Sequence, residues 1–196
     1  GYSFMKNLKI IFKDVLYCSY YFNNFDKENI KNKNFKTIII TWANKKNFGR
    51  SGILKDKYFN VTNYYKKKSI LWYIVYLDKN LPKKISENII LFQPIKDKFP
   101  NLIQLFIHIL KNFKNIFFNI EYFLFSVSSQ SILADQIAKN FSKYTNEEIE
   151  NVFIPYEGQP FQNEIIRLIK NDCPKAKITG YVHAPPQSIP TNLLKK

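Results

Sequence analysis

Residues 150–186 read ENVFIPYEGQPFQNEIIRLIKNDCPKAKITGYVHAPP. A short apolar run at 152–154 is followed by a turn that contains Gly158, and then by apolar residues at helical spacing as far as Ile169. Pro174 cannot continue that helix, and a second apolar run follows at 178–182. This order of strand, helix and strand predicts a right-handed crossover between two parallel strands.

A polar cluster follows each of the two predicted strands, at 156–159 and at 183–185. Open α/β sheets bind their ligands beyond the carboxyl ends of parallel strands, so we expect Glu157 and His183 to face one crevice. Glu157 has a glycine beside it and suits a base or a hydrogen-bond acceptor, but capping the next helix explains it equally well. His183 precedes a rigid Ala-Pro-Pro that would hold its ring toward the crevice, and a structural bond to a loop carbonyl is the alternative.

Three further apolar runs, at 37–42, 69–77 and 88–92, have the β-branched composition of buried strands. The connection around 81–84 is too short for a crossover helix, which favours an antiparallel pair or an edge strand for the last two runs. Helices are expected at 6–25, at 101–125 with a break near 112–119, and at 128–144, where Ser128 or Ser129 would be the N-cap.

The predicted fold is therefore α/β, a Rossmann-like open and mostly parallel sheet flanked by helices. Residues 1–36 would form a helical or irregular lead-in, and residues 37–196 the Rossmann-like domain. The last residues follow a loop without completing an element, so we expect the sequence to be a fragment whose second domain is missing.

The chain has a net charge of +15, but of its 30 basic residues only Arg50 and Arg167 are arginines, and the lysines are spread along the sequence. Nucleic-acid recognition favours clustered charge and the bidentate guanidinium, so no nucleic-acid partner is expected. Abundant Lys, Asn, Ile, Phe and Tyr indicate AT-rich codon usage instead. An anionic partner, such as a membrane surface or a nucleotide, is the alternative.

Residues 101–125 are apolar and aromatic, but Lys111, Lys114 and Glu121 interrupt every window long enough to span a membrane. We expect a buried or interfacial helix, with peripheral contact to the inner membrane left open. His108 on its apolar face is interpreted as a core histidine. Cys18 and Cys173 match no metal or redox spacing, which favours a reduced, cytoplasmic protein.

The common catalytic motifs are absent: there is no P-loop, GxGxxG, HExxH or GxSxG. Gly49 and Gly52 could let backbone amides approach a phosphate, but an ordinary loop is the favoured interpretation. No DxD pair is present to hold a nucleotide diphosphate through a metal, so no metal site is expected.

The segments YEGQPF at 156–161 and GYVHAP at 180–185 resemble the YExQPWE and GYxH pattern of bacterial surface-carbohydrate biosynthesis proteins of the GT-B glycosyltransferase type. The runs ITWANKKNFGRSGILKDKYFN and WYIVYLDKNLPKKI are similar to the amino-terminal half of such proteins. Phe161 stands where the pattern has tryptophan, and the acidic residue that follows is shifted to Glu164.

This resemblance implies one half of a metal-independent, two-domain enzyme that builds capsule or lipopolysaccharide. The chain would form the acceptor side of the cleft and take a saccharide or lipid-linked saccharide, with a nucleotide-sugar as co-substrate and no other cofactor. Glu157 and His183 would be catalytic. The surrounding motif residues would bind substrate: Tyr156, Gly158, Gln159, Tyr181 and Pro185.

A non-catalytic α/β module is the competing interpretation. It would bind a nucleotide, or attach a polysaccharide assembly to a membrane through its basic and aromatic surface. An epimerase is disfavoured because no dinucleotide fingerprint follows the first predicted strand.

Overall fold

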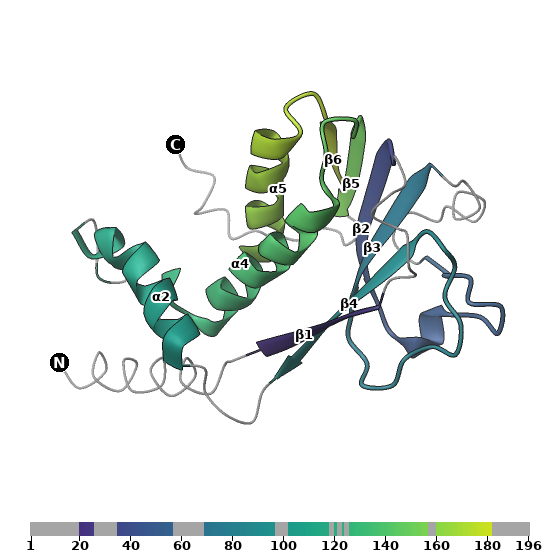
Figure 1. The fold of residues 1–196 in the computed structure, drawn as a ribbon, viewed down its shortest axis with the longest axis horizontal. Coiled ribbons are helices and arrows are strands. Elements are labelled where there is room, and N and C mark those ends of the chain that lie inside the picture. Colours follow the sequence, from purple (N-terminus) through teal and green to yellow (C-terminus); the bar gives the residue numbers. More distant parts are fainter. Residues whose placement is uncertain are drawn as a thin grey trace, which may run out of the picture.

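A computed structural model describes residues 20–25, 35–56, 69–96, 102–117, 120, 123, 126–156 and 160–181. Six strands form one sheet in the order β1-β4-β3-β2-β5-β6 (Figure 1). The strands are β1 (Tyr20–Phe25), β2 (Thr37–Ala43), β3 (Ile70–Tyr76), β4 (Ile89–Lys96), β5 (Asn151–Pro155) and β6 (Lys177–Tyr181). The five strands from β2 to β6 are mutually parallel, which confirms the predicted α/β, Rossmann-like class.

The order of the strands reverses at β2. From β2 the chain adds β3 and then β4 on one side, and later adds β5 and β6 on the other. The topological switch point of the sheet therefore lies between the carboxyl ends of β2 and β5, at Ala43 and Pro155. In open α/β sheets, ligands bind in the crevice that forms at this point, just beyond the carboxyl ends of the strands.

Two predictions about the strands are wrong. β3 and β4 are parallel, with Trp72 opposite Ile89, and not an antiparallel pair; neither is an edge strand, because β1 pairs with the outer side of β4. The connection at 77–88 has about twelve residues and reaches roughly 40 Å when extended, whereas the seven-residue β3 is only about 23 Å long. An irregular chain can thus return along the sheet without a helix.

The second correction concerns the predicted helix at 6–25. Residues 20–25 form the edge strand β1, which runs antiparallel to β4 from Tyr20 opposite Lys96 to Phe25 opposite Leu91. Residues 6–19 lie outside the described part of the chain. The lead-in segment therefore contributes a strand to the sheet of the main domain.

The helices follow the predictions closely. Those whose bounds the structure describes are α2 (Leu102–Asn112), α4 (Ser129–Phe141) and α5 (Pro160–Asp172), with short 3-10 turns η2 (Lys45–Asn47), η4 (Phe113–Phe117) and η5 (Ser142–Tyr144). The change from α2 to η4 lies at the predicted break. Ser128 caps α4, its hydroxyl oxygen accepting a hydrogen bond from the backbone N–H of Ser131 at 3.3 Å.

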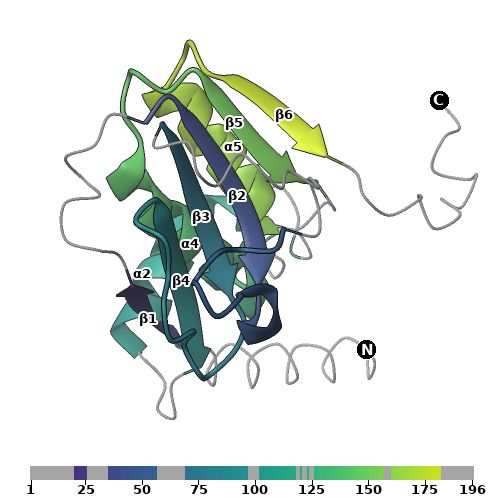
Figure 2. The ribbon, with the colours of Figure 1, turned by 90° about the vertical axis from the view of Figure 1, so that its right-hand side faces the viewer.

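The two faces of the sheet are covered differently. Helices α4 and α5 pack on one face, and the connections at 45–56 and 77–88 cover the other, as Figure 2 shows. Every residue of β3 is buried, so the strand is apolar throughout its length and not alternating. Tyr73 lies at the centre of the helical face, with its ring centroid 5.1 Å from that of Phe141.

The Tyr73 hydroxyl donates a hydrogen bond to Asn140 Oδ1 at 3.1 Å. Burial, with a smaller contribution from Tyr144, raises the pKa of Tyr73 well above its usual range. The neutral phenol is therefore the form that this core holds. Its ring and its hydroxyl connect the central strand to α4.

Separate variants that remove the hydroxyl or the whole ring of Tyr73 should show how much each contributes to the free energy of unfolding. Tyr73→Phe keeps the ring but removes one hydrogen-bond partner of Asn140, and should lower the free energy of unfolding by about 1 kcal/mol. Tyr73→Ala should lower it by about 3–5 kcal/mol because a large cavity remains. Urea unfolding measures both, with Tyr156→Phe at a half-exposed ring as the control. If Tyr73→Phe were as stable as wild type, the hydroxyl would have no structural role.

Candidate functional site

The carboxyl ends of β5 and β6 bring two predicted site residues together. Tyr156 directly follows β5 and Tyr181 ends β6, and the backbone N–H of Tyr156 donates to the Tyr181 carbonyl at 2.8 Å. Their side chains are 40% and 42% exposed. The predicted juxtaposition of the two strand ends is confirmed for these residues. Tyr156 also borders the switch point, because β5 is the strand next to β2.

Gly180 explains how the two motifs fit against each other. A Cβ atom at Gly180 would lie 3.3 Å from Tyr156 Cβ and 3.7 Å from its Cγ. The side chain of Tyr156 thus lies directly over the backbone of β6, where any other residue would press against it. The glycine of the GYVH segment makes room for the tyrosine of the YEGQP segment.

The other predicted site residues lie outside the described part of the chain. They are Glu157, Gly158, Gln159, His183 and Pro185. The structure describes the strand ends from which these residues continue, so their roles stay predictions.

Sequence reasoning missed Gln162 in this region. Its side chain is fully buried, and its Nε2 donates a hydrogen bond to the Pro155 carbonyl at the end of β5. This bond fixes the start of α5 against the strand that precedes the tyrosine. Phe161 beside it is also buried and meets Trp42 edge to ring, with centroids 5.9 Å apart. The residue at the pattern's tryptophan position is therefore part of the core.

The turn after β2 has its amides occupied by the protein itself. The N–H of Lys45 donates to Asp78 Oδ2 at 2.6 Å, and that of Lys46 to Asn44 Oδ1 at 3.1 Å. The N–H of Asn47 bonds to the Asn44 carbonyl at 3.0 Å. A nucleotide-binding Rossmann domain directs such amides at phosphate. Here a carboxylate of the neighbouring connection takes that place.

Asp78 also influences the tyrosine that ends β3. Burial, followed by the nearby charge of Asp78, raises the pKa of Tyr76. The Tyr76 hydroxyl donates to the Asn80 carbonyl at 2.6 Å. Together these contacts hold the start of the 77–88 connection close to the turn after β2.

Gly49 and Gly52 have structural roles, as the favoured interpretation expected. The N–H of Gly49 donates to the Ile53 carbonyl and that of Gly52 to the Gly49 carbonyl, both at 3.0 Å. Gly52 has a φ of 79°, and a Cβ there would lie 2.7 Å from the carbonyl carbon of Lys84. The glycine lets the 49–54 loop approach the 77–88 connection, and no phosphate is needed to explain it.

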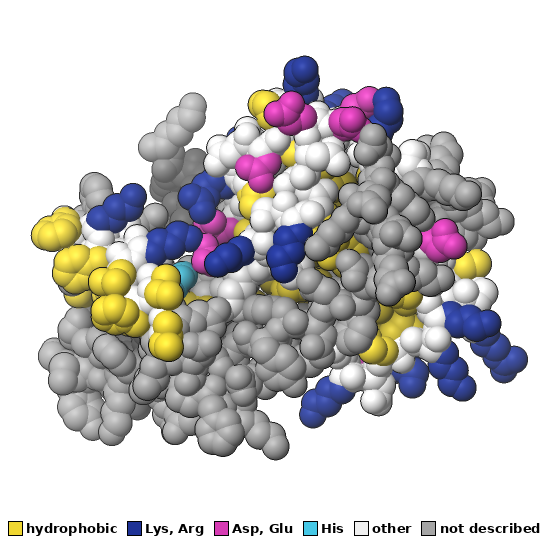
Figure 3. Space-filling view, in the orientation of Figure 1, with side chains coloured by type: hydrophobic (Ala, Val, Ile, Leu, Met, Phe, Trp, Pro, Cys, Tyr) yellow, Lys and Arg dark blue, Asp and Glu magenta, His cyan; other side chains and the backbone are white. Residues whose placement is uncertain are grey.

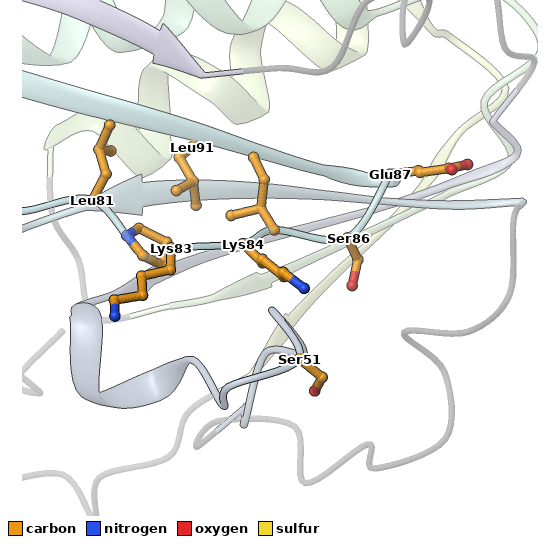
Figure 4. Close-up of a pocket in the computed structure, with 9 residues that line it drawn as sticks. Ser51, Leu81, Lys83, Lys84, Ser86, Glu87 and Leu91 are labelled. Atoms are coloured by element: carbon orange, nitrogen blue, oxygen red, sulfur yellow. The ribbon is translucent and has the colours of Figure 1, made fainter.

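A hollow of about 710 Å³ lies between these two connections (Figure 4). Ser51 borders it on one side, and Lys83, Lys84 and Ser86 border it on the other. It opens on the face of the sheet opposite to α4 and α5, and its lining contains neither Tyr156 nor Tyr181. We place the candidate site at the tyrosines, because they lie at the carboxyl ends of two adjacent parallel strands, whereas the hollow is lined mainly by the connection that precedes β4.

Comparisons of the chain with protein-family models, with curated proteins and with solved structures found no match. Among the described residues, no group of three or more His, Cys, Asp or Glu side chains is placed to hold a metal ion. No helix in the described part of the chain combines the length and apolar character needed to cross a membrane.

The contact between Gly180 and Tyr156 can be tested by a double-mutant cycle. Gly180→Ala places a methyl group against Tyr156, whereas in a Tyr156→Ala background the ring is gone and the methyl group is accommodated. We expect a coupling free energy of about 0.5 kcal/mol or more in urea unfolding. Gly49→Ala is the control, since its nearest neighbour would be 3.8 Å from the new Cβ. Additive effects of the Gly180 and Tyr156 substitutions would contradict the contact.

Proposed function

We propose that this chain is the acceptor-side half of a GT-B glycosyltransferase that transfers a sugar from a nucleotide-sugar to a surface polysaccharide. The fold supports the proposal, because each half of such an enzyme is a Rossmann-like sheet with its ligands at the carboxyl edge. Here the strands β2 to β6 have the required parallel arrangement, and the switch point is flanked by β2 and β5.

The observation that carries the proposal is the pair of tyrosines at that edge. Tyr156 and Tyr181 are joined through their backbones and leave about two fifths of each side chain exposed. A tyrosine ring offers an apolar face and a hydroxyl at its tip. Sugars combine an apolar face of C–H groups with many hydroxyls, so a paired tyrosine surface suits them.

The hydrogen bonds in the turn after β2 favour an acceptor-side role for this chain over nucleotide binding. Its amides already bond to Asp78 and Asn44, and an incoming phosphate would have to displace a carboxylate. The proposal therefore assigns the phosphates of the donor mainly to the other half of the enzyme. Glu157 would act as base or sugar ligand, and His183 would contact the acceptor or the donor phosphate.

Sugar binding by the tyrosines can be measured without enzymatic activity. Saturation-transfer NMR of this chain with a panel of methyl glycosides should give signals for at least one sugar, reduced about fivefold or more in Tyr156→Ala, because loss of the ring removes the stacking surface. Phe117→Ala removes an exposed aromatic ring elsewhere and should leave the signals unchanged. No signal from any glycoside, or equal loss in both variants, would contradict the proposal.

Catalysis is tested in the complete enzyme. Glu157→Ala and His183→Ala should each lower the rate of sugar transfer at least about tenfold, the usual minimum for loss of an acid–base group, while the melting temperature stays unchanged. Lys170→Ala, at an exposed position on α5, is the control. Wild-type rates in both alanine variants would remove these residues from the mechanism.

A further inference from the structure

Helix α2 and the turn η4 carry a continuous apolar surface that faces solvent. Its side chains are 49–81% exposed, and Figure 3 shows hydrophobic side chains gathered over this part of the molecule. Six of the eleven large apolar side chains exposed in the described part of the chain lie here. We call this surface the α2–η4 face: Ile103, Phe106, Ile107, Leu110, Phe113 and Phe117.

The spacing shows that the face is a property of the helix. Ile103, Phe106, Ile107 and Leu110 follow the three- and four-residue steps that place side chains on one side of an α-helix. η4 extends the surface, with the rings of Phe113 and Phe117 edge to ring at a centroid distance of 6.1 Å.

The orientation of α2 is fixed by polar contacts on its inner side. His108 is only 6% exposed, and its Nε2 lies 2.8 Å from the Ser126 carbonyl, to which it donates. Lys111 forms an ion pair with Asp135 of α4. The helix therefore turns His108 inward and Ile103, Phe106, Ile107 and Leu110 outward. The prediction that His108 is a buried, hydrogen-bonded histidine is confirmed, but its predicted place on the apolar face of the helix is wrong, because it lies on the inner side and the apolar residues face solvent.

Such a surface indicates a contact, because soluble proteins rarely leave large contiguous apolar patches exposed. The charges around it favour an anionic partner. Residues 102–117 contain no aspartate or glutamate, Lys114 of η4 is exposed, and the whole chain carries +15. A second copy would bring the same positive charge to the contact, whereas an anionic surface would neutralise it.

We propose that the α2–η4 face binds peripherally to a bilayer that contains anionic lipids. Phenylalanine, isoleucine and leucine side chains enter the boundary between headgroups and acyl chains, and Lys114 of η4 meets the headgroups. α2 and η4 lie in the plane of the interface and do not cross the bilayer. The proposal is independent of the transferase assignment, since it depends on α2 and η4 and not on the strand ends.

Vesicle co-sedimentation of the full chain tests whether the apolar side chains of the α2–η4 face contribute to lipid binding. The wild type should pellet with phosphatidylcholine vesicles in which about a quarter of the lipids are phosphatidylglycerol, and the double variant Phe106→Ser/Leu110→Ser should bind at least about fivefold more weakly. Leu77→Ser/Leu81→Ser removes two exposed leucines elsewhere and should bind as the wild type does. Circular dichroism and melting temperature verify that each variant is folded.

The electrostatic part is tested with charge variants and salt. Lys114→Glu should weaken binding to the anionic vesicles about fivefold or more, whereas Lys143→Glu, exposed on η5, should have a smaller effect. Raising the salt from about 0.1 M to about 0.5 M should also weaken binding.

Two outcomes would overturn the proposal. One is absence of wild-type binding to the anionic vesicles, or binding that Phe106→Ser/Leu110→Ser leaves unchanged. The other is a dimer seen in analytical ultracentrifugation that the same double variant dissociates, without lipid binding by the wild type. The face would then be an interface between two copies of the chain.

Discussion

Strand β3 leaves neither of its faces to water, and the rest of the domain is arranged around that constraint. All seven of its residues are buried, with Tyr73 and Val75 on one face and Trp72, Ile74 and Tyr76 on the other. A strand of this kind needs a neighbour on each edge and a layer over each face. β2 and β4 provide the edges, α4 and α5 cover one face, and the connections at 45–56 and 77–88 cover the other.

Much of this architecture could be predicted from local patterns. Each parallel strand is marked by an apolar, β-branched or aromatic run, and each described helix by apolar spacing or by a cap such as Ser128. The parallel direction of β4 could not be predicted, because a connection of about twelve residues is long enough to return along the sheet even when it contains no helix. Strand β1 was missed because its partner β4 lies some seventy residues away, from Tyr20 to Lys96 at one end of the pair. Local spacing contains no information about such a contact.

The candidate site, like the fold, could be predicted from the sequence only in part. That Tyr156 and Tyr181 meet follows from a general rule for parallel strands, so the sequence was sufficient to predict it. The role of Gln162 was not predictable, since a glutamine among charged helix residues has the pattern of an exposed position. The acceptor for its amide, the Pro155 carbonyl, exists only once strand and helix are packed. The hydrogen bond of the Lys45 amide after β2 likewise depends on Asp78, which a different connection brings to the turn.

The position of the switch point also affects the order in which the chain can fold. β2 pairs with β3, and β3 with β4, within one continuous stretch of sequence, but the other edge of β2 pairs with β5, and the contact from Lys36 to Glu150 spans 114 residues. While the chain emerges from the ribosome, the edge of β2 that faces β5 presents unpaired amides and carbonyls beside the apolar side chains of Ile38 and Ile40. Unpaired apolar edges of this kind promote association between nascent chains. The sheet edge at β2 is therefore complete only after the chain as far as β5 has been synthesised.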